Sequence, residues 1–238
     1  MKYVLFDLDG TLLPMDQDYF TVCFFNELSS YMEKIGYERK PFQEAMLAAI
    51  NAMKENDGKK TNEKIFYEVL IKRFGNRFLT DAKYFDDFNR TDFNNVQKYV
   101  GFTPRAQETV KKVKASGAKI VLASNPIFSV DGQKARMRWA GVNPDDFDYI
   151  TCAENSSFCK PKLGYYKEIL QKLGANPPDC VMIGNDTTDD TTSVEAGMKF
   201  FLITDCLINS KNTDVNVYPH GDYNAMNEFL DDFLKENN

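Results

Sequence analysis

The chain has 238 residues, of which 43% are hydrophobic and 13% are aromatic. This composition can fill a packed core, so it excludes a disordered chain and allows one large domain or a core with a smaller appendage. The formal net charge of −6 at pH 7 argues against a protein that binds nucleic acid through a basic face.

The five cysteines are odd in number and include no Cys-x-x-Cys pair, which argues against a disulfide framework or a zinc site. The apolar run after Met1 and Lys2 is cut off by Asp7 and is too short for a signal peptide. No stretch approaches the roughly 20 apolar residues of a membrane span. We therefore expect a cytoplasmic protein that does not bind membranes.

The first apolar run, Tyr3–Phe6, is typical of a strand buried on both faces. Residues 16–100 contain no convincing strand and show helical periodicity instead, because Phe20, Phe24 and Leu28 fall on one face of a helix. Further helices are expected at 42–53, 63–74 and 84–99. The sequence thus predicts an all-helical insert after the first strand.

Strands and helices alternate in the remaining residues, 101–238. The expected strands are 119–123, 149–152, 180–183 and 200–203, and the expected helices are 133–140, 165–173, 190–196 and 225–234. Repetition of strand, helix and strand predicts an α/β fold, in which helices cover the faces of a parallel sheet.

Two acidic residues, Asp7 and Asp9, follow the first strand directly. Residues two apart in an extended segment point the same way, so both carboxylates can face one pocket at the carboxyl end of the sheet, and Gly10 lets the chain turn. Asp7 could attack phosphorus to form an acyl phosphate, with Asp9 as acid and base. Two carboxylates this close favour a hard divalent cation, and we expect Mg²⁺. The alternative is a strand end with solvated acids.

A phosphoryl group also needs hydrogen-bond donors and a cation. Ser124, at the end of the second expected strand, supplies a hydroxyl, and Asn125 follows it, although Ser-Asn-Pro can also be a simple turn. Lys160 precedes Pro161, which favours an extended conformation in a loop. Its ammonium could neutralise Asp7 and the phosphate, and Lys162 is a competing candidate.

A second acidic segment, Gly184 to Asp190, follows the strand expected at 180–183. Asp186 comes almost directly after this strand, and we assign it to the metal, with Asn185 as a possible ligand in its place. Asp190 is either a second acid at the metal or the group that orients Lys160. Helix capping and the helix dipole would by themselves explain an acid at Asp189 or Asp190.

These segments, in this order, resemble the motifs of the haloacid dehalogenase-like (HAD) hydrolase superfamily. The first motif is Asp7-Leu8-Asp9-Gly10-Thr11, the second Ser124, the third Lys160, and the fourth Gly184-Asn185-Asp186 with Asp190. The fourth motif commonly begins Gly-Asp, so Asn185 is a departure. The resemblance implies a Rossmann-like doubly wound core, formed by residues 1–15 and 101–238, and a small all-helical cap, residues 16–100, as in phosphoglycolate phosphatases.

The resemblance further implies an aspartyl-phosphate intermediate and Mg²⁺ held by Asp7, the backbone carbonyl of Asp9 and a fourth-motif acid. Dehalogenases lack the second aspartate of the first motif, so Asp9 favours phosphoryl chemistry. We therefore expect a Mg²⁺-dependent phosphatase acting on a small phosphorylated metabolite. The expected catalytic residues are Asp7, Asp9, Ser124 and Lys160, the expected metal site is Asp7, Asp9, Asp186 and Asp190, and the expected phosphate-binding residues are Gly10, Thr11, Ser124, Asn125 and Lys160.

Two other functions stay open. A phosphomutase of the beta-phosphoglucomutase type would use the same Asp7, and a non-catalytic binding protein could retain the hydrolase scaffold. The single histidine, His220, is expected in a surface loop, so a mechanism that relies on a Ser/His/Asp or Cys/His arrangement has little support.

Overall fold

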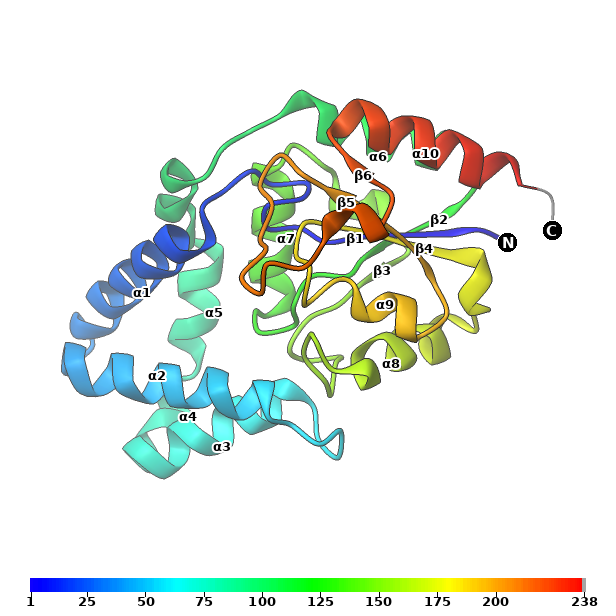
Figure 1. Cartoon of the computed structure of the whole chain (residues 1–238). Helices are drawn as coiled ribbons and strands as arrows, with labels where there is room; N and C mark the ends of the chain where they lie inside the picture. Colours follow the sequence, from blue (N-terminus) through cyan, green and yellow to red (C-terminus); the bar gives the residue numbers. More distant parts are fainter. Residues whose placement is uncertain (237–238) are drawn as a thin grey trace.

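The structure, a computed structural model, describes residues 1–236 as a parallel sheet flanked by helices, with a second group of helices beside it (Figure 1). All strands of the sheet run parallel, in the order β3-β2-β1-β4-β5-β6. The strands are β1 Tyr3–Phe6, β2 Lys119–Leu122, β3 Tyr149–Ile150, β4 Cys180–Gly184, β5 Lys199–Ile203 and β6 His220–Gly221. The predicted α/β class with a Rossmann-like doubly wound sheet is confirmed.

The strand order reverses around β1. The chain runs outward from β1 to β2 and β3, and then returns to place β4 on the other side of β1. Phe6 pairs with Leu122 of β2 and with Ile183 of β4, so the three strands end at the same edge. Ligands bind at the carboxyl ends of strands at such a reversal. The residues that follow β1, β2 and β4 therefore meet at one site.

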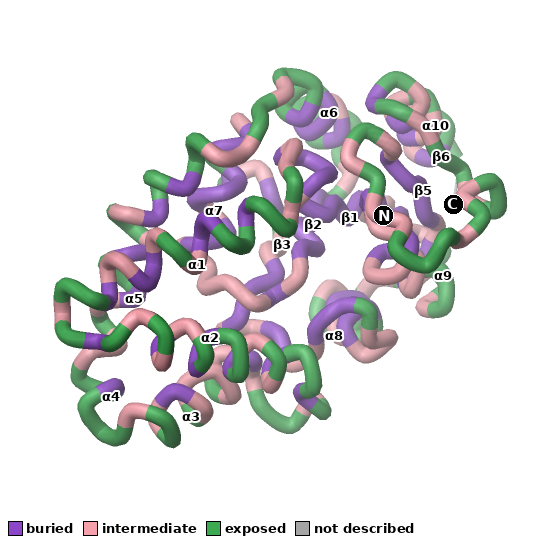
Figure 2. Tube along the Cα trace, turned by 60° about the vertical axis from the view of Figure 1, so that its left-hand side comes forward, coloured by how far each residue is buried: buried purple, intermediate pink, exposed green. Residues whose placement is uncertain are grey.

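Both faces of the sheet are buried. Val4 and Phe6 pack into one hydrophobic cluster, with residues of α6, α7 and α10, whereas Leu5 packs into a second cluster with residues of α8. This follows from the alternation of side chains along a strand. Figure 2 shows the strands largely as buried tube. The helices of this part are α6 Pro104–Ala115, α7 Val130–Trp139, α8 Leu163–Leu173, α9 Thr192–Glu195 and α10 Tyr223–Lys235.

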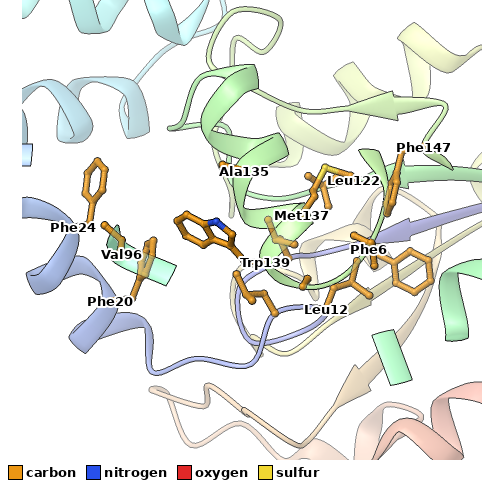
Figure 3. Close-up of a cluster of buried hydrophobic side chains, with 14 of the residues drawn as sticks. Phe6, Leu12, Phe20, Phe24, Val96, Leu122, Ala135, Met137, Trp139 and Phe147 are labelled. Atoms are coloured by element: carbon orange, nitrogen blue, oxygen red, sulfur yellow. The ribbon is translucent and has the colours of Figure 1, made fainter. Parts of the chain in front are cut away.

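The segment between β1 and α6 contains only helices. They are α1 Gln17–Glu33, α2 Arg39–Lys54, α3 Asn62–Phe74, α4 Arg77–Asp81, α5 Lys83–Arg90 and the 3₁₀ helix η1 Asp92–Tyr99. Aromatic side chains join this group to the core, where the ring of Phe24 lies 5.1 Å from that of Phe128 and the ring of Phe93 lies 4.7 Å from that of Trp139. Figure 3 shows Phe20, Phe24 and Val96 on the side of the helical group and Trp139 reaching towards them from α7.

The two connections to this helical group lie side by side. The backbone N–H of Gly101 donates to the carbonyl of Pro14 at 2.7 Å. A Cβ at position 101 would come within 3.1 Å of the Pro14 carbonyl oxygen, so glycine permits this close approach.

Several predicted elements differ from the structure. The helix predicted at 84–99 is interrupted at Thr91, whose hydroxyl donates to the carbonyl of Asp87 at 2.6 Å and so competes with the helical pattern. Helix α7 begins at Val130 rather than 133, because Ser129 caps it, and α9 is shorter than the predicted 190–196. Helices α4 and α6 were not predicted.

The expectation of a surface loop at His220 is wrong in part. His220 is exposed, but it pairs with Leu202 as the first residue of edge strand β6. Within residues 1–236, no helix has the length and apolar character needed to cross a bilayer.

Candidate active site

A pocket lies at the carboxyl edge of the sheet, between the strand ends and helices α1 and α2. The core side of the pocket is lined by Asp7, Asp9, Ser124, Asn125, Ile127, Phe128, Lys160, Asn185, Asp186, Asp189 and Asp190. The opposite side is lined by Gln17, Phe20, Thr21, Phe24, Phe25, Leu47, Ile50, Asn51 and Lys54. Most of the residues predicted from the motifs thus meet in one cavity, although they come from distant parts of the chain.

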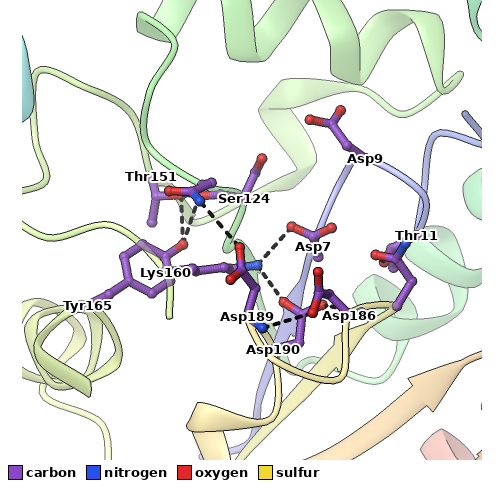
Figure 4. A network of polar contacts seen from close by, with 12 residues as sticks. Asp7, Asp9, Thr11, Ser124, Thr151, Lys160, Tyr165, Asp186, Asp189 and Asp190 are labelled. Carbon is purple, nitrogen blue, oxygen red and sulfur yellow. Dashed lines mark hydrogen bonds and ion pairs between the residues drawn. The ribbon is translucent and has the colours of Figure 1, made fainter. Parts of the chain in front are cut away.

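Lys160 is the centre of a buried charge network (Figure 4). Its ammonium Nζ lies 2.8 Å from Asp7 Oδ1 and 2.6 Å from Asp190 Oδ1, and all three residues are less than a tenth exposed. The competing Lys162 donates to the backbone carbonyl of Asn56 at 3.0 Å and does not line the pocket. The structure therefore places Lys160, and not Lys162, beside Asp7.

One buried cation here faces two buried carboxylates. Burial alone would lower the pKa of Lys160, but the charges of Asp190 and Asp7 outweigh it and hold that pKa well above its ordinary value. Burial raises the pKa of Asp7 and raises that of Asp190 to about 6, because the single ammonium offsets only part of the desolvation of each carboxylate. Lys160 is consequently a fixed positive charge at the site.

Asp9 lies apart from this network. In Figure 4 no dashed line joins it to the other residues drawn. Its Oδ2 accepts a hydrogen bond from Nη1 of Arg136, while its backbone carbonyl accepts one from the Gln17 amide at 2.8 Å. Its Oδ1 is buried and has no hydrogen-bond partner in the described residues.

The second motif is anchored through the backbone carbonyl of Ser124. The Ser124 carbonyl accepts hydrogen bonds from the Thr151 hydroxyl at 2.7 Å and from the Tyr165 hydroxyl at 2.8 Å. Asn125 donates to Asp189 Oδ2 at 3.5 Å, and its own Oδ1 is buried without a partner in the described residues. This anchoring fixes Ser124 and Asn125 along the pocket wall.

The fourth motif forms a tight turn after β4. Asp186 Oδ1 accepts the backbone N–H of Thr188 at 2.6 Å and that of Asp189 at 3.0 Å. Asn185 uses both ends of its amide, since Nδ2 donates to the Cys206 carbonyl at 2.6 Å and Oδ1 accepts from the Thr11 hydroxyl at 3.2 Å.

Gly10 and Thr11 do not line the pocket. Gly10 has φ +82°, and a Cβ at this position would lie 2.2 Å from Asn185 Nδ2. Thr11 is buried and bonded to Asn185. These two residues join the first motif to the fourth, behind the pocket surface.

The sequence did not predict several polar residues of the site: Gln17, Arg136 and Asp189, and, on the wall formed by α1 and α2, Thr21, Asn51 and Lys54. Gln17 opens α1, and Arg136 lies one helical turn after Gln133 on α7, which follows the Ser124 loop. The sequence signal for Gln17 and Arg136 is their position, since Gln17 follows the first motif and Arg136 follows the second. Asp189 was attributed to helix capping, but it lines the pocket, and burial raises its pKa to about 6.

The described residues contain no cluster of three or more acidic, histidine or cysteine side chains arranged as a ready metal cage. Asp7 and Asp186 nevertheless line the same pocket from adjacent strands. Their oxygen atoms fit Mg²⁺, which typically takes one or two carboxylates together with water and substrate phosphate.

Comparison with known proteins agrees with this arrangement. The sequence model of the haloacid dehalogenase-like hydrolases matches residues 1–197. A glyceraldehyde 3-phosphate phosphatase from Methanothermobacter thermautotrophicus is 26% identical over 113 residues, which are 47% of this chain and 49% of that protein. The match therefore spans about half the length of that relative.

The fold is shared with solved structures, of which two are described. A HAD phosphatase from Thermococcus onnurineus superposes with a TM-score of 0.59 at 18% identity, covering 97% of this chain and 98% of the other. A predicted phosphoglycolate phosphatase from Haemophilus somnus gives a TM-score of 0.56 at 14% identity, with the same coverage. The family match over most of the chain leads to one conclusion: this protein belongs to the haloacid dehalogenase-like hydrolase family.

Proposed function

We propose that the protein is a Mg²⁺-dependent phosphatase that hydrolyses a small phosphate monoester through a phosphoryl group carried on Asp7. The observation that carries this proposal is the Lys160 ammonium fixed between Asp7 and Asp190 at the reversal point of the sheet. A buried carboxylate held by a buried cation at a pocket surface is a nucleophile with a defined position.

In this proposal, Asp7 attacks phosphorus and Asp9 protonates the departing oxygen. Asp9 then takes a proton from the water that hydrolyses the acyl phosphate. Lys160, the Ser124 hydroxyl and the Asn125 amide would stabilise the charge on the transferring phosphoryl oxygens. Asp9 lies two residues after Asp7 and lines the same pocket, which supports this role.

Asp7, Asp186 and the backbone carbonyl of Asp9 would hold the Mg²⁺ ion. When bound, the ion supplies positive charge that neutralises the phosphate and the acidic pocket. Asn185 is a weaker candidate, because both ends of its amide already make hydrogen bonds. Asp190 acts instead as the group that orients Lys160.

Residues 16–100 would act as a cap over a core made of 1–15 and 101–238. The two linkers, joined by the hydrogen bond from Gly101 to Pro14, give this segment a narrow connection, and α1 and α2 line one wall of the pocket. Closing such a wall over the substrate excludes water before attack. The phosphatase names of the relative and of the similar structures support phosphoryl chemistry on a small metabolite.

The test is hydrolysis of p-nitrophenyl phosphate by the purified protein, with Mg²⁺ and then with excess EDTA. We expect Mg²⁺-dependent release of nitrophenolate and phosphate that is lost in Asp7→Asn, because the amide keeps the size of the side chain and removes the nucleophile. Activity that persists in Asp7→Asn would refute the assignment. Transfer of the phosphoryl group to an added sugar phosphate, without release of phosphate, would indicate a mutase instead.

A further inference from the structure

Helix α7 carries a fully buried arginine that points at the first motif. Arg136 has no exposed surface, and its Nη1 donates to Asp9 Oδ2. Its Nη2 donates to Gln133 Oε1, and its guanidinium lies 4.0 Å from the ring centre of Phe128. Asp9 is the one carboxylate paired with Arg136 in the described residues.

This arrangement is costly for an arginine that serves only the core. A buried guanidinium loses its hydration, and here its Nε also lacks a hydrogen-bond partner in the described residues. The Asp9 side chain is 20% exposed and lines the pocket, so hydration could satisfy this carboxylate without Arg136. The buried pair is therefore better explained by the orientation that it gives to Asp9.

Given the proposed function, we infer that Arg136 is a positioning residue for the acid/base Asp9. Arg136 holds Oδ2 and thereby fixes the carboxyl group of Asp9, whose side chain is 20% exposed, at the pocket where the proton is exchanged. A carboxyl group that is held at one oxygen keeps a fixed orientation in the pocket.

The proton and electron balance of this step is simple. An oxygen of the Asp7 carboxylate forms a bond to phosphorus as the bond from phosphorus to the leaving oxygen breaks. The leaving oxygen keeps that electron pair and takes the proton from the carboxyl group of Asp9. Asp9 becomes a carboxylate, and its charge is matched by the guanidinium of Arg136. In the second half of the reaction, the oxygen of a water molecule forms a bond to phosphorus as the bond from phosphorus to Asp7 breaks. The Asp7 carboxylate recovers that electron pair, and the Asp9 carboxylate takes the proton from the water.

The position of Arg136 is tied to the cap as well. Phe128 contacts the guanidinium on one side and the ring of Phe24, on α1, at 5.1 Å. Gln17, also on α1, donates to the backbone carbonyl of Asp9. Helices α7 and α1 thus hold Asp9 at its side chain and at its backbone.

The test compares two leaving groups in Arg136→Met and in the conservative Arg136→Lys. The value of kcat/KM reports the steps up to phosphoryl transfer to Asp7, so it isolates the need for a proton donor. For an alkyl phosphate, we expect kcat/KM to fall by about 10- to 100-fold in Arg136→Met, since a misplaced acid loses part of its contribution. For p-nitrophenyl phosphate, whose leaving group departs without a proton, we expect a change below about threefold.

Met137→Ala is the matched control, because Met137 is fully buried on the same helix and is not among the residues that line the pocket. It should lower the melting temperature but leave the ratio of kcat/KM for the alkyl phosphate to kcat/KM for p-nitrophenyl phosphate as it is in the wild type. Arg136→Lys should restore part of the loss with the alkyl ester. The inference would be overturned if Arg136→Met lost kcat/KM equally for both substrates, or if its ratio of the two kcat/KM values equalled that of Met137→Ala. A wild type that hydrolyses neither ester would instead refute the proposed phosphatase.

Discussion

Replacing Lys160 with methionine should destabilise the protein far more than the loss of an ordinary ion pair. Methionine keeps most of the volume and removes the charge, so Asp7 and Asp190 are left buried without the cation that lies 2.8 and 2.6 Å from them. Removing one partner of a buried pair costs about 3–5 kcal/mol. Because two carboxylates lose their partner here, we expect a loss near the upper end of that range.

The measurement is urea unfolding of the metal-free protein in EDTA at pH 7.5, so that a bound ion does not replace the missing charge. Lys59→Met is the control. The Lys59 ammonium lies 2.6 Å from Asp57, as close as Lys160 lies to Asp190, but the Lys59 side chain is 83% exposed. That variant should unfold at the same urea concentration as the wild type. A loss below about 1 kcal/mol in Lys160→Met, the range of an exposed pair, would show that the network is solvated and would refute the reasoning.

Three further changes test other parts of the structure. Asp9→Asn should lower kcat/KM for an alkyl phosphate by about 10²- to 10⁴-fold and barely affect p-nitrophenyl phosphate; equal losses would point to a role through the metal. Gly10→Ala should reduce the free energy of unfolding more than Gly117→Ala. Both glycines have a left-handed φ, near +80°, which alone costs alanine about 1–2 kcal/mol, but only at Gly10 does a Cβ meet another residue within 4 Å, Asn185. Similar losses would show that Asn185 moves aside freely. Glu63→Gln should raise the melting temperature at pH 7.5, because burial and the charges of Glu154 and Asp86 raise the pKa of Glu63. Ionised Glu63 is therefore unfavourable in the folded state, stability falls as pH rises through that pKa, and the gain should vanish below the ordinary glutamate pKa, at about pH 4. A gain of the same size at both pH values would contradict this.

The elements of the sheet could be predicted because their residues are apolar on both faces. Tyr3–Phe6 and the strands that pair with it are short, nearly continuous apolar runs. A strand that is buried on both faces needs apolar side chains at successive positions, so such runs indicate strands directly. Edge strand β6, by contrast, has two residues, His220 and Gly221, and pairs on one side only. Such a strand is fixed by the neighbouring strand β5 and leaves no period to detect.

Helix α6 was missed although it carries recognisable signals. Pro104 occupies its first turn, and Ala106, Val110 and Val113 are buried at helical spacing. These residues form a narrow apolar stripe in an otherwise charged segment, which gives only a weak periodic signal. The break at Thr91 depends on a local side-chain hydrogen bond, which periodicity does not report.

The motif residues of the site could be predicted because Asp7, Ser124 and Asp186 closely follow strands and Lys160 precedes a proline in the loop before α8. Asp7, Ser124, Lys160 and Asp186 all line the pocket. Arg136 and Gln17 could not be found in this way, because each reaches Asp9 from a helix and is defined by tertiary contacts alone. The role of Asn185 also needed the structure, since its amide is used by Thr11 and Cys206.

The most direct test of the account is to quench the enzyme during turnover of p-nitrophenyl phosphate with Mg²⁺, digest it, and locate any bound phosphoryl group by mass spectrometry. The account predicts a phosphoryl group on Asp7 that forms and decays at rates compatible with turnover and that is absent from Asp7→Asn. A phosphoryl group on another residue, or phosphate release that proceeds while Asp7 remains unmodified throughout, would contradict the central claim.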